Sequence, residues 1–518
     1  MTNIYKTIKS MRSLCLLCVL CLLSALCASC DDYLDVAPSD KQTAAQVFSS
    51  KAGFYTASNG IYDALSGDAL YGKQMTWEAL DLMVPSYVTS NSTQYMKSLA
   101  NNSYTDTYAA PVLSSIWGTA YELILNCNLL IDQIDQQQGL LTTQEANVLK
   151  GEMLGVRAFL HLDMLRLFGP VPGKGLDQLA IPYNESTDVF VHDLLSIKDA
   201  GKKIIADLDA AEELLKSDPI IENGPMMSEP TGSESVQLRY RQYRMNYYAT
   251  IALKARAYYW VCDTANAKKE ALRLIEDPKV QQMFPPVDPN KLLANSSNPD
   301  RVFSSEVFMG VYDKDRDQVY NDYFAFTAPS TQRLLPLSTY INSSQGLFGH
   351  LMLGLESYDY RYQSQWELAS GVGAAGYSFI KYKKIDQPDP NDENSEYYYA
   401  KMIPIITMQE MYYIMMEYGD TDMDKFTWYN KARIRRGCPD LEAMGMAPTL
   451  AMYWGYGYAG YFAGQEVRRE TWGTGQYFYY AKHNQSMGDY GSFSPMDNGS
   501  GKSGNINVQP PLPADEMK

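Results

Sequence analysis

Amphipathic helices that come in adjacent pairs constrain the fold of this chain more than any other feature. Apolar residues recur every three or four positions along 144–168, which is the spacing of one helix face, and Gly169-Pro170 then ends the segment. Further helices are expected at 47–65, 77–83, 116–134, 193–216, 239–262, 264–276, 407–418 and 423–436. Small residues line one face of the 239–262 segment, so neighbouring helices can approach closely, as they do in tetratricopeptide repeats.

The segments between the helices are long and irregular. Residues 279–400 mix loops with short strand-like runs, such as 307–311 and 379–382. Loop-rich stretches are expected at about 68–110, 279–400 and 440–518. The predicted fold class is therefore mostly α, with tetratricopeptide-like helix pairs forming a scaffold that carries long loops and a few short strands. Long loops on a rigid scaffold are usually functional.

The N-terminus has the pattern of a lipoprotein signal peptide. Lys6, Lys9 and Arg12 precede an apolar run of about 13 residues, and Ala28-Ser29 supplies small residues just before Cys30. The apolar run is shorter than the roughly 20 residues that a membrane-spanning helix requires. Residues 1–29 are therefore predicted to be a signal peptide, residues 30–518 a single domain, and Cys30 the lipidated residue that anchors the protein to a membrane.

Charge and cysteine content exclude several classes of protein. The net charge is −16 and becomes more negative once the basic signal peptide is removed, so nucleic acid is not an expected partner. After Cys30, the remaining cysteines are Cys127, Cys262 and Cys438. Three widely spaced cysteines are not a disulfide framework, and buried free thiols are expected, with one incidental disulfide as the alternative.

Two of the loop regions combine aromatic residues with polar neighbours. Tyrosine is abundant, with 41 residues against 16 phenylalanines and 7 tryptophans, and its flat ring and hydroxyl suit wet binding surfaces. Trp77 is expected in the core, and Asp359 with Arg361 as a structural pair. The candidate ligand-binding residues are Tyr87, Tyr95, Asn101, Tyr104, Tyr320, Tyr323, Phe324, Tyr358, Tyr360 and Trp366.

The motifs of common enzymes are missing from the sequence. The four histidines form no HExxH pattern or close metal pair, and no GxSxG elbow occurs. Gly501-Lys502-Ser503 resembles part of a phosphate-binding loop, but Met496 stands where the first glycine is required. Two catalytic carboxylates of a glycosidase remain an open alternative, because the chain has 60 acidic residues. No catalytic residue, metal site or cofactor is expected.

Several segments in collinear order resemble the SusD/RagB family of outer-membrane nutrient-binding lipoproteins. The strongest are Arg157-Ala158-Phe159-Leu160-His161 continuing through Arg166-Leu167-Phe168-Gly169-Pro170, and the closing Pro511-Leu512-Pro513-Ala514-Asp515. Similar segments are 31–38, 205–211, 253–258, 359–361 with 381–382, and 409–417 with 429–437. The chain departs from the family pattern near 466–480, where Val467, Tyr477 and Tyr480 replace expected charged residues.

The resemblance implies a binding protein and not an enzyme. Such proteins capture oligosaccharides, or in some branches peptides, and deliver them to a SusC-like TonB-dependent transporter. The resemblance also implies a lipid-anchored protein of the outer membrane that faces the cell exterior. Asp31-Asp32, directly after the lipid cysteine, resembles the acidic surface-export signal of such lipoproteins. Peptide binding on the same scaffold and surface glycoside hydrolysis are the alternative functions.

Overall fold

The structure is a computed structural model. It describes residues 43–84, 86–188, 190, 192–230, 235–292, 298–336, 341, 347–348, 355–371, 374–385, 398–446, 459–484 and 507–513. The predicted signal peptide and Cys30 lie outside these residues. The chain divides into two compact units, residues 1–54 and 55–518, and the prediction of a single domain over 30–518 stays a prediction. None of the helices in the described part of the chain combines the length and the hydropathy of a membrane span.

Helices dominate the secondary structure. They are α2 (Ala44–Val47), α3 (Lys51–Leu65), α4 (Ala79–Met83), α5 (Gln94–Ala100), α6 (Ala110–Gln136), α7 (Thr143–Phe168), α8 (Ile197–Leu214), α9 (Ile220–Asn223), α10 (Tyr247–Trp260), α11 (Thr264–Ile275), α12 (Pro278–Met283), α13 (Arg316–Val319), α15 (Tyr360–Gln365), α16 (Met408–Tyr418), α17 (Asp422–Ile434), α19 (Ala459–Thr471) and α20 (Gln476–Asn484). The strands are β1 (Leu179–Ile181), β2 (Leu195–Ser196), β3 (Val307–Tyr312), β4 (Trp366–Gly371), β5 (Ala374–Phe379) and β6 (Met402–Thr407). The predicted fold class is confirmed.

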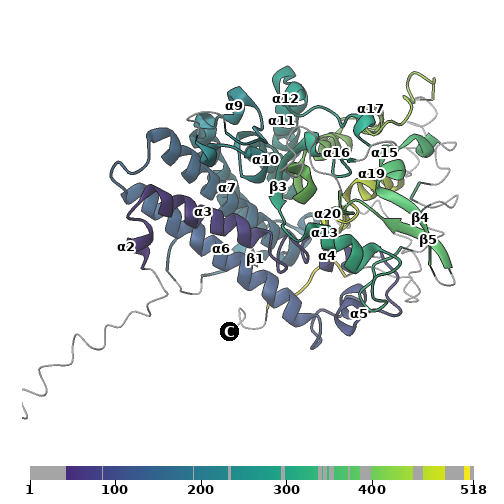
Figure 1. Ribbon diagram of the computed structural model, residues 1–518, viewed down its shortest axis with the longest axis horizontal. Coiled ribbons are helices and arrows are strands. Elements are labelled where there is room, and N and C mark those ends of the chain that lie inside the picture. Colours follow the sequence, from purple (N-terminus) through teal and green to yellow (C-terminus); the bar gives the residue numbers. More distant parts are fainter. Residues whose placement is uncertain are drawn as a thin grey trace, which may run out of the picture. The chain divides into compact units, whose positions relative to one another are not determined.

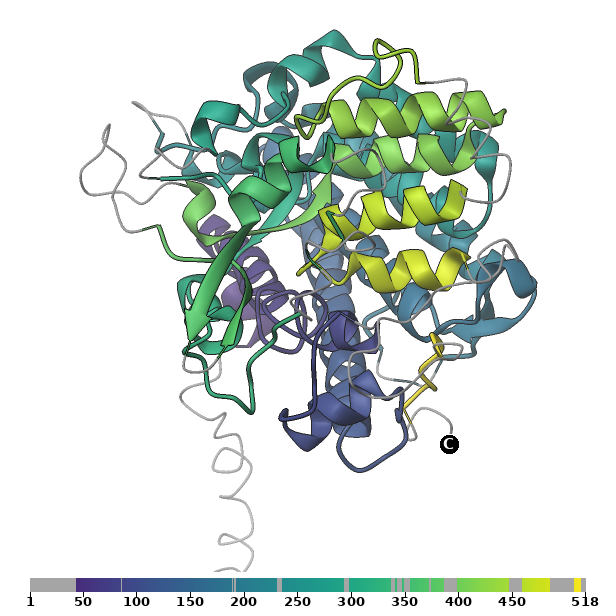
Figure 2. The same ribbon diagram turned by 90° about the vertical axis from the view of Figure 1, so that its right-hand side faces the viewer.

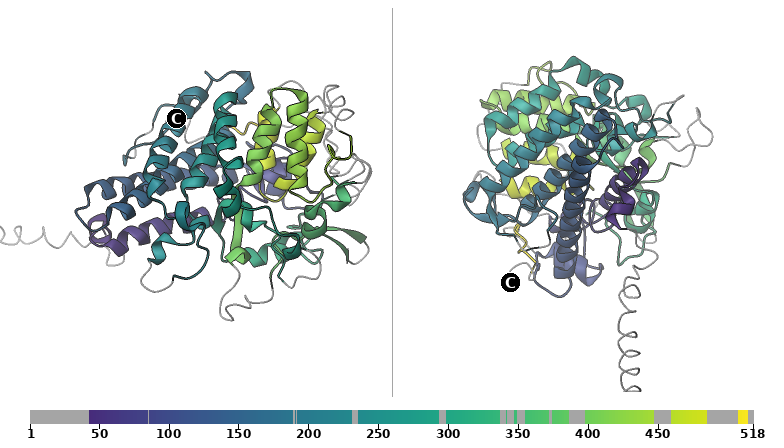
Figure 3. Two further views of the ribbon diagram at one scale, coloured as in Figure 1. Left: turned by 90° about the horizontal axis from the view of Figure 1, so that it is seen from above. Right: turned by 90° about the vertical axis from the view of Figure 1, so that its left-hand side faces the viewer.

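The long helices stack one against the next along the chain. Each helix contacts the next in the order α6, α7, α8, α10, α11, α16 and α17. Figure 3 shows the succession as a change of colour from blue through teal to green. Each helix buries one face on its predecessor and another on its successor, which is how repeat scaffolds build a continuous core.

Helix α7 is the centre of this stack and is buried along most of its length. Thr142 and Glu145 form a capping box at its start, and Gly169 follows its last residue. Glycine is required where the neighbouring segments approach most closely: a Cβ at Gly151 would lie 2.7 Å from Leu215 Cγ, and one at Gly155 would lie 2.5 Å from Met245 Cγ. The expected helix over 144–168 is confirmed.

The helix expected over 239–262 begins later than predicted. Tyr240 has φ +53°, and Arg241–Tyr243 form a single 3₁₀ turn. Asn246 then caps α10, because its side chain accepts a hydrogen bond from the amide of Ala249. The Asn246 side chain also donates to the Phe308 carbonyl of β3 at 2.7 Å. The cap therefore fixes both the start of α10 and its position beside the strand.

Three small antiparallel sheets, β1–β2, β3–β6 and β4–β5, interrupt the helical scaffold. The strand predicted at 307–311 is confirmed as β3. The strand predicted at 379–382 is wrong except for Phe379, the last residue of β5. The chain turns after Phe379, because the Lys383 amide donates to the Ile380 carbonyl at 3.0 Å.

Two C-terminal helices, α19 and α20, occur in the stretch predicted to be loop-rich. Figure 2 shows them in yellow beside the lime-green α16 and α17. Helix α19 contacts α16, α17 and α20, and α20 contacts α4. This pair was not predicted, because 440–518 is rich in Gly and Tyr and the two helices are only 13 and 9 residues long.

A buried carboxylate joins the C-terminal helices to the early part of the chain. Asp81 in α4 accepts hydrogen bonds from the amides of Gly473 at 2.8 Å and Gly475 at 3.1 Å. A Cβ at Gly475 would lie 2.6 Å from the Met75 carbonyl oxygen, and the residue has φ +71°. Only glycine fits this junction between α19 and α20 without strain.

The thiols of Cys127, Cys262 and Cys438 are free. Cys127 and Cys438 are buried as expected. Cys262 is exposed, which corrects the expectation of a buried thiol at that position. It lies in the turn between α10 and α11, with φ +60°, where the chain passes over the surface.

Candidate functional site

The structure brings the two aromatic loop regions together. The Val88 amide donates to the Leu335 carbonyl at 2.9 Å, and the Thr93 amide donates to the Thr331 carbonyl at 3.0 Å. These bonds hold the loop before α5 against the chain that follows the π-helical turn η7 (Tyr320–Phe324). Candidate residues more than 200 positions apart in the sequence therefore share one region of the surface.

Four of the candidate residues belong to the core. Their exposed fractions are 2% for Tyr87, 3% for Tyr104, 0% for Phe324 and 5% for Trp366. The Tyr87 hydroxyl donates to Asp81 at 3.0 Å, and that of Tyr104 donates to the Asn507 carbonyl. Side chains so deeply covered offer little surface to a ligand in this structure, and their role in binding stays a prediction. Trp77, expected in the core, is 2% exposed.

Tyr323 is the centre of a group, which we call the Tyr323 cluster, made of the partly exposed Lys73, Tyr95 and Tyr323 and the fully buried Glu78. The Tyr323 ring lies on Trp77 with a centroid separation of 4.4 Å, and the Lys73 ammonium lies 5.2 Å from the centre of the Tyr323 ring. The Tyr95 hydroxyl donates to Glu78 at 2.8 Å. Burial raises the pKa of Glu78, but Lys73 and the hydroxyl of Tyr95 oppose this effect.

Tyr320 is the centre of a second group, the Tyr320 cluster, with Glu367 and Lys383. The Tyr320 hydroxyl donates to Glu367 at 2.6 Å, and Lys383 donates to the same carboxylate at 2.8 Å. The Lys383 ammonium lies 5.1 Å from the centre of the Tyr320 ring. Burial and the Glu367 carboxylate both raise the pKa of the Tyr320 phenol, so it remains a neutral hydrogen-bond donor.

The same short segment positions both clusters, because Tyr320 and Tyr323 both belong to the π-helical turn η7. Helix α13 directly precedes η7, and strand β4 contains Glu367. Figure 1 shows α13 and the β4–β5 hairpin on the same side of the stacked helices. The arrangement offers two tyrosine rings, two ammonium groups and carboxylate acceptors. Such a surface can stack on flat apolar faces and exchange hydrogen bonds with neighbouring hydroxyls.

The remaining candidates lie on other elements. Asn101 follows the last residue of α5. Tyr358 is 56% exposed at the end of the short η9 turn (Leu355–Tyr358). Tyr360 begins α15, and its ring lies so close to Gly437 that a Cβ there would be 2.3 Å from Tyr360 Cε1. We therefore keep Tyr95, Tyr320 and Tyr323 as the candidates that the structure groups together.

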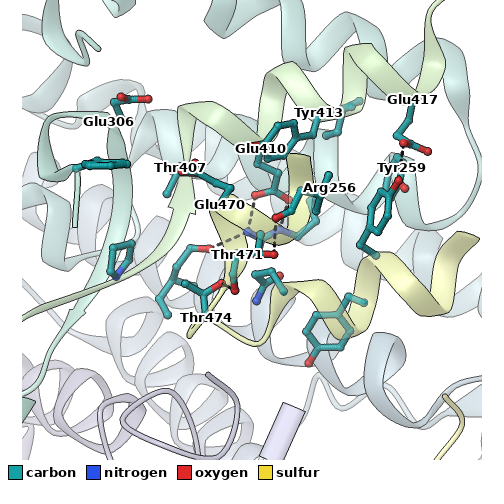
Figure 4. Close-up of a pocket in the computed structure, with 18 of the residues that line it drawn as sticks. Arg256, Tyr259, Glu306, Thr407, Glu410, Tyr413, Glu417, Glu470, Thr471 and Thr474 are labelled. Atoms are coloured by element: carbon teal, nitrogen blue, oxygen red, sulfur yellow. Dashed lines mark hydrogen bonds and ion pairs between the residues drawn. The ribbon is translucent and has the colours of Figure 1, made fainter. Parts of the chain in front are cut away.

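A separate, partly open cavity of about 110 Å³ lies between α10, β6, α16, α19 and α20. Figure 4 shows Arg256 of α10 reaching toward Glu410 of α16 in its wall. The guanidinium donates to both carboxylate oxygens at 2.6 Å and to the Ile405 carbonyl at 2.9 Å. This bidentate pair is buried at Arg256, and the Glu410 side chain is 25% exposed.

Further carboxylates of the cavity wall have strongly different environments. Glu470 accepts two hydrogen bonds from Arg436 at 2.7 Å and one from Arg361 at 3.1 Å. Burial alone would raise the pKa of Glu470, but the two arginines lower it to about 2. Glu417 accepts one hydrogen bond from Tyr480 at 3.0 Å, and burial raises its pKa to about 7.

The sequence did not indicate this cavity, because its lining comes from seven separated stretches of the chain. One signal was present: lining residues Glu410 and Arg436 fall in segments on which the family resemblance depends. In the described ranges, His, Cys, Asp and Glu side chains form no group of three that could hold a metal ion.

Comparison with known proteins places this fold in one class. Residues 32–228 match a SusD-like family model described as starch-binding and associating with the outer membrane. A SusD-like carbohydrate-binding protein of Bacteroides vulgatus has a TM-score of 0.57 at 18% identity, over 84% of each chain. SusD superfamily proteins of Bacteroides fragilis (15% identity, 91% of this chain and 98% of that chain) and Bacteroides thetaiotaomicron (14%, 91% and 96%) have TM-scores of 0.59 and 0.60. No curated protein sequence matches the chain.

The class is thus that of SusD-like helical proteins, and its fold extends over most of the chain. The family match over residues 32–228 and the shared fold confirm the resemblance to the SusD/RagB family seen in the sequence.

Proposed function

We propose that this protein captures oligosaccharides at the cell surface and delivers them to a SusC-like TonB-dependent transporter of the outer membrane. The observation that carries the proposal is the pairing of the Tyr320 and Tyr323 clusters on one helical turn. Support also comes from the family description as starch-binding and from the Bacteroides vulgatus neighbour described as carbohydrate-binding.

The chemistry of the two clusters suits a sugar ligand. A pyranose ring has apolar C–H faces that stack on aromatic rings, and its hydroxyls need donors and acceptors nearby. The rings of Tyr320 and Tyr323 supply the platforms, and Lys73, Lys383 and Glu367 supply the polar partners. Because these side chains are only half-buried, the site is wet, and modest affinity for a single oligosaccharide is expected.

Titration calorimetry on the soluble protein that begins after Cys30 tests the ligand class. A panel of oligosaccharides and a panel of peptides are compared. We expect an oligosaccharide to bind without being cleaved, and Tyr320→Ala and Tyr323→Ala each to weaken binding by about tenfold, which is the scale of one aromatic contact. Tyr108→Ala is the matched control, because Tyr108 is 53% exposed and outside both clusters. Peptide binding without oligosaccharide binding, or release of a cleaved product, contradicts the proposal.

The anchoring part of the proposal depends on Cys30. We expect Cys30→Ala to leave oligosaccharide binding in solution unchanged and to abolish growth on that oligosaccharide, because the binding protein would no longer be held above its transporter. Surface localisation by protease accessibility is measured on the same cells. Normal growth of the mutant strain would exclude the anchor as a requirement for uptake.

A further inference from the structure

The cavity contains one basic group that forms no direct pair with the surrounding acids. Lys381 lines the cavity and is 4% exposed. Its ammonium makes no hydrogen bond or ion pair with any of the described residues. By contrast the other deeply buried lysine in this region, Lys482, donates to the Leu167 carbonyl at 2.7 Å. Buried ammonium groups are almost always paired, because the loss of hydration is costly.

The nearby carboxylates are already occupied by arginines. Arg436 and Arg361 bind the oxygens of Glu470, as described above, and Glu306 accepts from Arg435 and Arg436 at 2.7 Å each. Lys381 therefore has no carboxylate bonded directly to it, although Glu470 and Asp81 are near enough to favour its charged form. Burial lowers the pKa of Lys381 to about 8, with Glu470 opposing the effect, so most of the ammonium is protonated at neutral pH.

The size and lining of the cavity restrict what could balance this charge. A volume of about 110 Å³ is below the roughly 150 Å³ of an engineered cavity that binds benzene, and it corresponds to about three or four waters at about 30 Å³ each. Apolar side chains, among them Val302, Phe303, Ile405 and Val467, form much of the remaining wall. A solute of about five or six non-hydrogen atoms with one charged end and one apolar end fits these constraints.

We propose that the cavity binds a small monocarboxylate, with its carboxylate paired to Lys381 and its short hydrocarbon part against the apolar wall. This site is distinct from the two tyrosine clusters, so its existence does not depend on the proposed capture of oligosaccharides. Glu410, whose side chain is 25% exposed, marks the edge at which the wall reaches solvent and a ligand of this size can enter.

Equilibrium dialysis of radiolabelled butyrate against the soluble protein tests the proposal, with 1-butanol and butylammonium as competitors. We expect one saturable butyrate site that neither competitor displaces. Lys381→Met keeps the length of the side chain and removes its charge, and we expect it to weaken butyrate binding by roughly tenfold or more, the range for a hydrogen bond to a charged group. Lys384→Met, an exposed lysine three positions away, is the control and should bind butyrate as the wild type does.

The Lys381→Met variant also tests whether the Lys381 ammonium has a partner within the protein. Removal of an uncompensated buried charge should leave the thermal midpoint of the ligand-free protein unchanged or higher. A Lys381→Met protein that is much less stable, or does not fold, shows that Lys381 has a partner and overturns the proposal. Absence of saturable butyrate binding by the wild type, equal displacement by 1-butanol, or unchanged binding by Lys381→Met overturns it too. Oligosaccharide binding should be the same in all of these proteins.

Discussion

Arg361 is the residue whose replacement should test the buried charge network most directly. It is fully buried and donates to both oxygens of Asp359, at 2.9 and 2.6 Å, so the two form a bidentate pair. It also contacts Glu466 at 2.9 Å and Glu470 at 3.1 Å. Arg361→Met removes the cation and keeps a long apolar side chain in its place.

The loss of stability can be estimated from the carboxylate that loses its arginine partner. Glu470 keeps its bidentate partner Arg436, and Glu466 keeps Arg469 at 3.3 Å. Asp359 keeps the backbone amide of residue 361 at 2.9 Å and the Cys438 thiol at 3.7 Å as donors, but it loses its cation. One buried carboxylate stripped of its ion pair costs about 3–5 kcal/mol, so Arg361→Met should lower the free energy of unfolding by that amount.

Urea unfolding of the soluble protein measures this loss. The double variant Asp359→Asn/Arg361→Met removes both charges, and we expect it to be at least about 1 kcal/mol more stable than Arg361→Met alone, since contacting residues couple by about 0.5–3 kcal/mol. Lys384→Met should change stability by less than about 0.5 kcal/mol. If Arg361→Met is as stable as the wild type, the ion-pair network does not hold this part of the molecule, and the reasoning fails.

Three further changes should affect stability through separate mechanisms, each measured by urea unfolding. Asp81→Asn places an amide donor toward two backbone amides and should cost about 1–3 kcal/mol; a loss below about 0.5 kcal/mol would contradict this. Gly437→Ala should cost about 1–3 kcal/mol, because φ is +80° and the new Cβ meets Tyr360. Gly60→Ala, in open helical space, should be neutral or stabilising, and an equal loss at both glycines would refute the steric argument. The pKa of Glu417 is raised to about 7 in the fold from an ordinary value of 4.5, so its contribution is complete below pH 4.5 and is lost as pH rises to about 7. Glu417→Gln should therefore flatten the decline in stability over this range, and an unchanged decline would exclude Glu417 as its source.

Periodic helices were predictable because their pattern is local. The 144–168 helix shows both its repeating apolar face and its stop signal in contiguous sequence, and the structure has α7 at those positions. The start of α10 was not predictable by the same means. It depends on Asn246 accepting from the helix while donating to the Phe308 carbonyl of a strand 62 residues away.

The sequence predicted which types of residue form the candidate site but not which of their side chains are exposed. Tyr87 and Tyr95 lie in the same aromatic loop region, yet Tyr87 is buried over Asp81 and Tyr95 is half-exposed above Glu78. Their difference arises from the chain at 473–475, which shares the Asp81 carboxylate with Tyr87. The sequence around either tyrosine does not indicate this contact, because residues 473–475 lie almost 400 positions away from Asp81.

The hydrogen bonds from the 473–475 loop to Asp81 have a consequence for the order in which the chain folds during its synthesis. They connect residues separated by 392 and 394 positions, and Lys482 reaches the Leu167 carbonyl across 315. A chain synthesised from its N-terminus can form its helical hairpins early, but these contacts must wait until almost all of it has emerged. A prematurely terminated product would lack the segment that covers α4, beside the tyrosine clusters. Completion of the proposed ligand surface thus requires completion of the polypeptide, so a truncated copy would lack this surface and be exposed to proteolysis.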